Sequence, residues 1–138
     1  MTWVGPKPFG ALPGYLRVID VGLVPYRNSA FNRGSFPLKT LEYLAAGRGV
    51  VGTGLPATRW LGTDLVRIAD QPAAFADAVE REAARPRTAA LAATRREFAA
   101  RHSWARRAAD IHAAIEARCG SMPWGLDVSA LVSVSVFW

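Results

Sequence analysis

The sequence has little cysteine or histidine and no long hydrophobic run. The single cysteine, Cys119, excludes an intramolecular disulfide and is expected to be an unreactive thiol, which fits a reducing cytoplasm. His102 and His112 lack metal-ligand spacing, and no Ser/His/Asp or Cys/His arrangement is present, so neither a metal site nor a nucleophilic triad is predicted. No segment approaches the roughly 20 apolar residues of a membrane-spanning helix. The first residues lack the basic and apolar regions of a secretory signal peptide, so none is expected.

The charge is unbalanced, with 17 Lys and Arg against 11 Asp and Glu, a formal net charge of +6. Beyond residue 80 arginines alternate with acidic residues on alanine-rich segments, which is typical of a solvated helix face. Clustered, unopposed basic residues would favour nucleic acid, so no nucleic-acid partner is expected, whereas attraction to an anionic membrane surface stays open. These residues are Arg81, Arg85, Arg87, Arg95, Arg96, Arg101, Arg106, Arg107 and Arg118, with Glu80, Glu82, Glu97, Asp110 and Glu116.

The order of apolar segments predicts alternating strands and helices in one domain. β-branched and apolar runs predict strands at 2–4, 18–24, 50–51 and 65–69. Helical patterns are expected at 11–16 (interrupted by Pro13-Gly14), 37–47, 73–84, 88–100 and from 103 onward, and 27–36 is expected to be a loop. Strands that alternate with helices indicate an α/β fold with a partial, Rossmann-like parallel sheet, followed by C-terminal helices.

Apolar spacing within the helices predicts which side chains face the core. Trp104, Ala108, Ile111 and Ile115 recur as a stripe behind Ser103, which is a plausible N-cap, so Trp104 is predicted to be a core residue. The other side chains expected to face inward are Leu38, Leu41, Leu44, Ala45, Phe75, Ala78, Val79, Leu91 and Phe98.

The last twenty residues differ from the rest. Residues 122–125 are expected to be a loop, and 132–138 alternates like a strand that ends in aromatic residues. We therefore divide the chain into a domain at 1–118 and an atypical tail at 119–138, which suggests a truncated or frame-shifted end.

The segment 32–47 combines three features that suit an anionic ligand. Gly34 and Ser35 precede a helix that Pro37 begins, and a helix start offers unpaired N–H groups and a positive dipole end. Lys39 lies in the first turn, and Glu42 lies one turn further, beside the apolar face. Ligands of open α/β sheets bind where such helices begin, although Lys39 and Glu42 at i, i+3 would equally form a surface pair.

The run Ser-x-Pro-Leu-Lys-x-x-Glu-Tyr-Leu-Ala-Ala-Gly at 35–47 resembles the donor-site segment of bacterial group-1 glycosyltransferases, which are retaining enzymes of the GT-B fold. Residues 3–7, 20–26 and 102–104 resemble neighbouring parts of that family, and the resemblance covers roughly 2–118. It implies a partial C-terminal domain that binds a nucleotide-sugar. It assigns no cofactor, metal or catalytic residue.

The resemblance implies a role for each matched residue. Glu42 would bind the ribose hydroxyls of the donor, Lys39 would contact the donor or balance charge, and Gly5, Pro6 and Lys7 would lie near the nucleobase. The residues that would face the diphosphate and sugar are Ser35, Phe36, Pro37 and Leu38. Two positions depart from the family pattern, because Gly34 stands where a second glutamate is common and Gly49 stands where proline is usual.

The family also implies parts that this sequence does not contain. Such enzymes hold the acceptor on an N-terminal domain, so the chain alone is expected to be inactive without that domain or a partner chain. The alternative is a non-catalytic nucleotide-binding or interaction remnant. A basic nucleic-acid-binding helical module is a further alternative.

Overall fold

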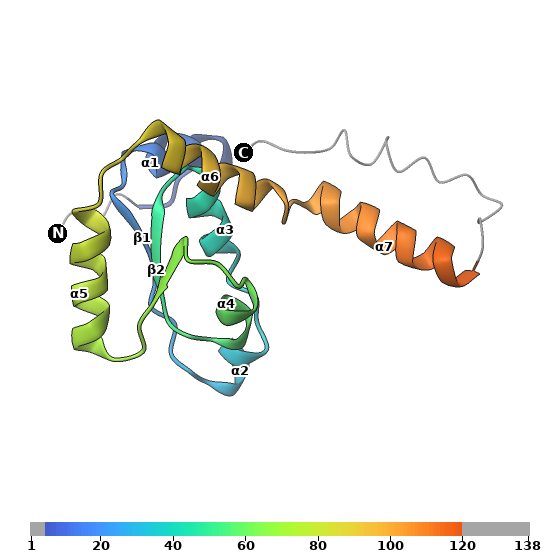
Figure 1. Cartoon of the computed structure of the whole chain (residues 1–138), viewed down its shortest axis with the longest axis horizontal. Coiled ribbons are helices and arrows are strands. Elements are labelled where there is room, and N and C mark those ends of the chain that lie inside the picture. Colours follow the sequence, from blue (N-terminus) through green and yellow to red (C-terminus); the bar gives the residue numbers. More distant parts are fainter. Residues whose placement is uncertain (1–4, 120–138) are drawn as a thin grey trace.

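The computed structural model describes residues 5–119, so the expectations for 2–4, 122–125 and 132–138 lie outside the described residues. Three parallel strands form a sheet in the order β1-β2-β3, flanked by helices (Figure 1). The elements are η1 Phe9–Ala11, α1 Leu12–Val18, β1 Val21–Val24, α2 Ala30–Arg33, α3 Leu38–Ala45, β2 Gly49–Gly52, α4 Pro56–Trp60, β3 Val66–Ile68, α5 Pro72–Ala83, α6 Ala89–Ala100 and α7 Trp104–Cys119. The predicted α/β fold with a partial parallel sheet is confirmed.

The strands are short, and each pairs in parallel with its neighbour without a break in register. Val21 pairs with Gly49, and Val50 pairs with Val66. All four residues of the central strand β2 are buried, as expected for a strand covered on both faces. The prediction of a strand from Val18 was wrong, because α1 runs through Val18 and the strand is confined to Val21–Val24. Pro13 lies in the first turn of α1, where a missing N–H costs little, so it does not interrupt the helix.

The core lies between the sheet and the helices on its two faces. Figure 1 shows α5 on one side of the sheet and α3 on the other, with α6 across α3. The buried core residues that contact one another are Val24, Leu44, Val50, Leu65, Val66 and Ala99, with Tyr43, Ala45, Leu91 and Phe98 packed against them. Burying these apolar side chains contributes about 25 cal/mol per Å² of area removed from water.

Helix α3 begins one residue after Pro37 and ends in a glycine turn. Gly47 has φ of 75°, its N–H donates to the Leu44 carbonyl at 2.8 Å, and the Arg48 N–H donates to the Tyr43 carbonyl at 2.9 Å. This pair of bonds is the Schellman motif, which glycine permits in the left-handed region. The predicted inward face is partly wrong: Leu44 is fully buried, but Leu38 is exposed and Thr40 takes the buried position.

The prediction that the whole of 27–36 is a loop was wrong in part, because a short helix lies within it. Ser29 begins the four-residue helix α2, and its hydroxyl accepts a hydrogen bond from the Asn32 N–H at 3.2 Å. A serine N-cap satisfies an N–H that the helix itself leaves unpaired.

Two charged residues of the predicted solvated face are buried instead. The side chains of Glu82 on α5 and Arg95 on α6 are 3% and 6% exposed and form an ion pair. Arg95 Nη1 also donates to the Gly47 carbonyl at 3.2 Å, at the end of α3. Burial lowers the pKa of Arg95, while the nearby carboxylate of Glu82 partly offsets the effect.

Helix α7 extends away from the body of the molecule (Figure 1). The Arg106 N–H donates to Ser103 Oγ at 3.2 Å, which confirms the predicted cap. The prediction that Trp104 is a core residue was wrong, because it is 76% exposed and Ile111 and Ile115 are exposed too. The spacing of the stripe is helical, but none of the described segments packs over it. Among the described helices, none is long and apolar enough to span a membrane.

Candidate functional site

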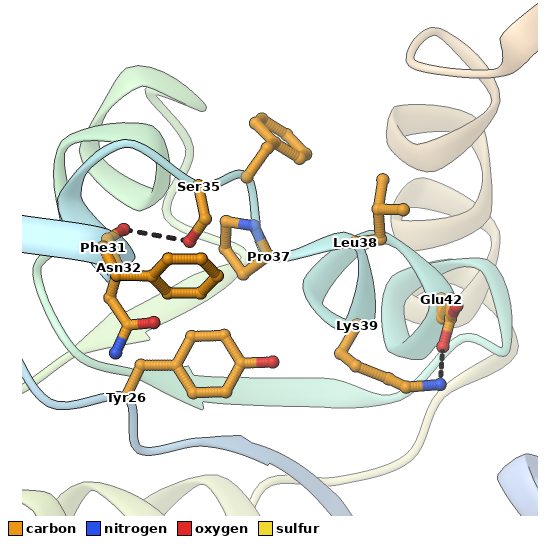
Figure 2. Close-up of a pocket in the computed structure, with 9 residues that line it drawn as sticks. Tyr26, Phe31, Asn32, Ser35, Pro37, Leu38, Lys39 and Glu42 are labelled. Carbon is orange, nitrogen blue, oxygen red and sulfur yellow. Dashed lines mark hydrogen bonds and ion pairs between the residues drawn. The ribbon is translucent and has the colours of Figure 1, made fainter.

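A hollow of about 380 Å³ lies beyond the carboxyl end of β1, where the chain passes through α2 into α3 (Figure 2). This is the edge at which open α/β sheets bind ligands. The residues that line it are Tyr26, Phe31, Asn32, Ser35, Phe36, Pro37, Leu38, Lys39 and Glu42. The structure thus brings together all six residues that the sequence placed at a donor site.

The start of α3 forms one wall of the hollow, although not all its N–H groups are free. The Leu38 N–H donates to the Phe36 carbonyl and the Thr40 N–H to the Pro37 carbonyl, each at 3.0 Å. Ser35 does not cap this helix, because its hydroxyl donates to the Asn32 carbonyl at 3.0 Å. Since Leu38 and Lys39 are exposed, the helix start faces solvent and the hollow rather than the core.

Lys39 and Glu42 form the charged end of the hollow. Lys39 Nζ makes an ion pair with Glu42 Oε2, as Figure 2 shows. The side chains are 50% and 21% exposed. An exposed pair of this kind is worth roughly 0–1 kcal/mol, so a ligand can separate it at little cost. Once separated, the ammonium group of Lys39 could bind an anionic ligand group, and the carboxylate of Glu42 could accept hydrogen bonds from ligand hydroxyls.

Aromatic side chains that the sequence reasoning missed form the other wall. In Figure 2 the rings of Tyr26 and Phe31 lie beside Pro37 and opposite Lys39. Thr53 Oγ1, beyond the end of β2, donates to the Tyr26 carbonyl at 2.8 Å and fixes the chain there. The sequence signal that could have indicated this wall is Phe31, an aromatic residue within an otherwise polar segment.

Phe36 links the hollow to a second group of rings. Its ring lies 6.2 Å from that of Trp60 on α4, and Trp60 lies 5.9 Å from His102, both edge to face. The guanidinium of Arg107 lies over the Trp60 ring at 5.2 Å. The pKa of His102 is lowered by its burial, with further contributions from the charges of Arg107 and Arg101.

The remaining candidates lie elsewhere. Gly5, Pro6 and Lys7 are not among the residues that line the hollow, and Lys7 Nζ lies 5.7 Å from the centre of the Tyr15 ring. Their assignment to a nucleobase stays a prediction. In the part of the chain that the structure describes, no three His, Cys, Asp or Glu side chains are grouped as metal ligands. His112 pairs with Glu116 on the flank of α7.

Neither departure from the family pattern leaves a defect in the structure. At Gly34 an added Cβ would come no closer than 3.7 Å to any neighbour, so glycine is not required there. At Gly49 an added Cβ would overlap the carboxylate of Glu82. Glycine at 49 therefore makes room for the buried ion pair.

Comparison with known families identifies the class of protein to which the chain belongs. The model of the group 1 glycosyl transferases matches residues 1–84, so the chain belongs to that family.

Among individual proteins, the chain is similar to the proposed teichuronic acid biosynthesis glycosyltransferase TuaH of Bacillus subtilis (strain 168), with 48% identity over 58 residues. That match covers 42% of this chain and 15% of the relative, so the chain represents only a small part of that protein. No solved structure matches the chain.

Proposed function

We propose that this chain provides the donor-binding part of a sugar transferase and holds a nucleotide-sugar in the hollow at the start of α3. The observation that carries the proposal is the convergence of Ser35, Lys39 and Glu42 on one hollow at the carboxyl edge of a parallel sheet. Membership of the glycosyl transferase family supports sugar transfer as the reaction of the complete enzyme.

The lining residues divide between the parts of such a donor. Glu42 accepts hydrogen bonds from the ribose hydroxyls, which its carboxylate oxygens suit. Lys39 turns from Glu42 towards the diphosphate, and the chain at 35–38 faces the phosphates and the transferred sugar. Tyr26 and Phe31 exclude water from the other side. The family resemblance implies a retaining reaction on a GT-B fold, without a resident metal or cofactor.

The binding site for the acceptor must be supplied by another part of the enzyme. Transfer requires the donor and acceptor to be held together in a closed cleft. We propose that an N-terminal domain or a partner chain completes the site, and that these 138 residues alone transfer no sugar. We also propose a cytoplasmic location, with the net charge of +6 favouring the anionic inner face of the membrane.

Nucleotide binding to the whole chain tests the donor site directly. Ligand-observed NMR with UDP, GDP and ADP should detect one preferred nucleotide. Glu42→Ala should weaken it roughly 10- to 100-fold, because a hydrogen bond to a charged group is worth about 1.5–3 kcal/mol. Glu97→Ala on α6, whose partner Arg101 lies 3.9 Å away at the surface, is the matched control and should bind like the parent.

Two outcomes would reject the proposal. If the folded chain binds none of the three nucleotides, segment 32–47 has no working pocket and the non-catalytic remnant becomes the better interpretation. If Glu42→Ala binds as the parent does, the nucleotide lies elsewhere. Salt-sensitive binding of DNA that ignores Glu42→Ala would favour the nucleic-acid module instead.

A further inference from the structure

Trp60 is a large exposed aromatic residue beside the proposed donor site. It ends the short helix α4, which follows β2, and therefore stands at the same edge of the sheet as the hollow. The residue is 59% exposed although its ring has Phe36 and His102 as edge-to-face neighbours. An exposed ring that neighbouring side chains hold in place is available for a ligand to stack on.

Positive charge without a carboxylate partner accompanies this ring. Within residues 5–119 Arg107 makes no salt bridge; its guanidinium lies over Trp60, and its Nη2 is 3.5 Å from His102 Nδ1. By contrast, the neighbouring Arg106 pairs with Asp110 at 3.1 Å. An unpaired guanidinium beside an exposed indole suits a ligand that has both an apolar face and a negative group.

We propose that Trp60, His102 and Arg107, here named the Trp60 platform, bind a sugar ring that carries a carboxylate or phosphate group. The C–H face of the sugar would stack on the electron-rich indole, and the guanidinium of Arg107 would pair with the anion. Neutral His102 would donate or accept a hydrogen bond with a hydroxyl.

The platform adjoins the hollow. Phe36 lines the hollow and also contacts Trp60, so only one side chain separates the two sites. A charged sugar on the platform would therefore lie next to a donor in the hollow. This relation to the donor rests on the proposed function; the binding of a sugar acid to the platform does not.

The test follows the indole N–H signals of the ¹⁵N-labelled whole chain during titration with glucuronate, glucose 1-phosphate, glucose, acetate and inorganic phosphate. Trp60→Phe identifies the Trp60 signal. Glucuronate or glucose 1-phosphate should shift it with a Kd on the order of millimolar, as expected for one small ligand, and at least fivefold more tightly than glucose. Which of the two binds better identifies the anionic group.

Variants separate the ring from the charge. Trp60→Ala should weaken sugar-acid binding at least tenfold while the other indole signals and the melting temperature show a folded chain. Arg107→Gln should abolish the preference over glucose and leave weak binding, whereas the matched Arg106→Gln should keep the preference. Trp60 and Arg106 are exposed and Arg107 is only partly buried, so folding should survive all three substitutions.

Three results would overturn the proposal. Acetate or phosphate alone could shift Trp60 as strongly as the sugar acids, which would make the ring irrelevant. Arg107→Gln could keep the full preference for sugar acids, or no sugar acid could shift Trp60 at all. Each of these can occur while UDP, GDP or ADP binding still depends on Glu42, so failure of the platform and failure of the donor site are distinguishable.

Discussion

Replacing Arg95 with methionine should destabilise the chain strongly, because it leaves a carboxylate buried without its main partner. The side chain of Glu82 is 3% exposed, and Arg95 both pairs with it and donates to the Gly47 carbonyl. Methionine keeps much of the volume of arginine but supplies neither the charge nor the donors. The loss is therefore electrostatic and not a packing defect.

The structure sets the expected loss in the free energy of unfolding. Removing one partner of a buried pair costs about 3–5 kcal/mol. Glu82 keeps two more distant cations, Arg67 at 3.5 Å and Arg85 at 3.7 Å, which moderates the penalty. With the lost bond to the Gly47 carbonyl added, we expect about 3 kcal/mol. For a domain of this size that lowers Tm by about 12 °C, at roughly 4 °C per kcal/mol.

Urea unfolding and thermal melts of the parent chain and three variants provide the assay. Arg95→Met should lose about 3 kcal/mol, and the double variant Glu82→Leu/Arg95→Met should recover most of it, since an apolar pair can replace a buried ion pair. Arg81→Met, on the exposed side of α5, should change stability by less than about 0.5 kcal/mol. A loss below about 1 kcal/mol for Arg95→Met, or a double variant no better than the single one, would refute the reasoning.

Two further outcomes follow from close packing and from protonation. Gly22→Ala should cost about 1–3 kcal/mol in urea unfolding because its Cβ would overlap Cγ and Cδ2 of the Tyr43 ring, and Tyr43→Ala in the same chain, which removes those atoms, should reduce that cost; equal costs in both backgrounds would contradict it. The pKa of His102 is lowered in the folded chain by burial and by Arg107, so the unfolded chain takes up its proton first, and stability should fall as pH drops through about 6.5. His102→Gln should flatten that part of the pH profile, and parallel profiles would show that another group is responsible.

Much of the fold could be predicted from local sequence, because its determinants are local. The β-branched residues of β1 and β2 and the proline and glycine that flank α3 specify those elements without reference to the rest of the chain. The boundaries of the elements were predicted less accurately than the elements themselves. Val18 fits a strand by composition, but tertiary context places it at the end of α1. The exposed stripe of α7 has the spacing of a core helix, since periodicity identifies a face and not what covers it.

The candidate site divides in the same way. The wall at the start of α3 lies within one contiguous segment, so its residues could be identified together. The opposite wall and the Trp60 platform bring residues from α2, α4 and α7 to one edge of the sheet, and no spacing in the sequence joins them. The buried pair of Glu82 and Arg95 was hidden for a related reason: alternating charge predicts a solvated face unless the partner helix is known.

Gly49 shows how that buried pair bears on the site. Where the family pattern has proline, any side chain would overlap the Glu82 carboxylate, so glycine and the ion pair depend on each other. Arg95 completes the arrangement, because it balances Glu82 and binds the Gly47 carbonyl at the end of α3. The departure at 49 therefore does not loosen the entry to β2, which stays buried and in register with β1. Since α3 is held at its last turn by the pair and at its side by β2, its first turn has a fixed position at the hollow. The geometry of the proposed donor site thus depends on a charge pair at the other end of the helix.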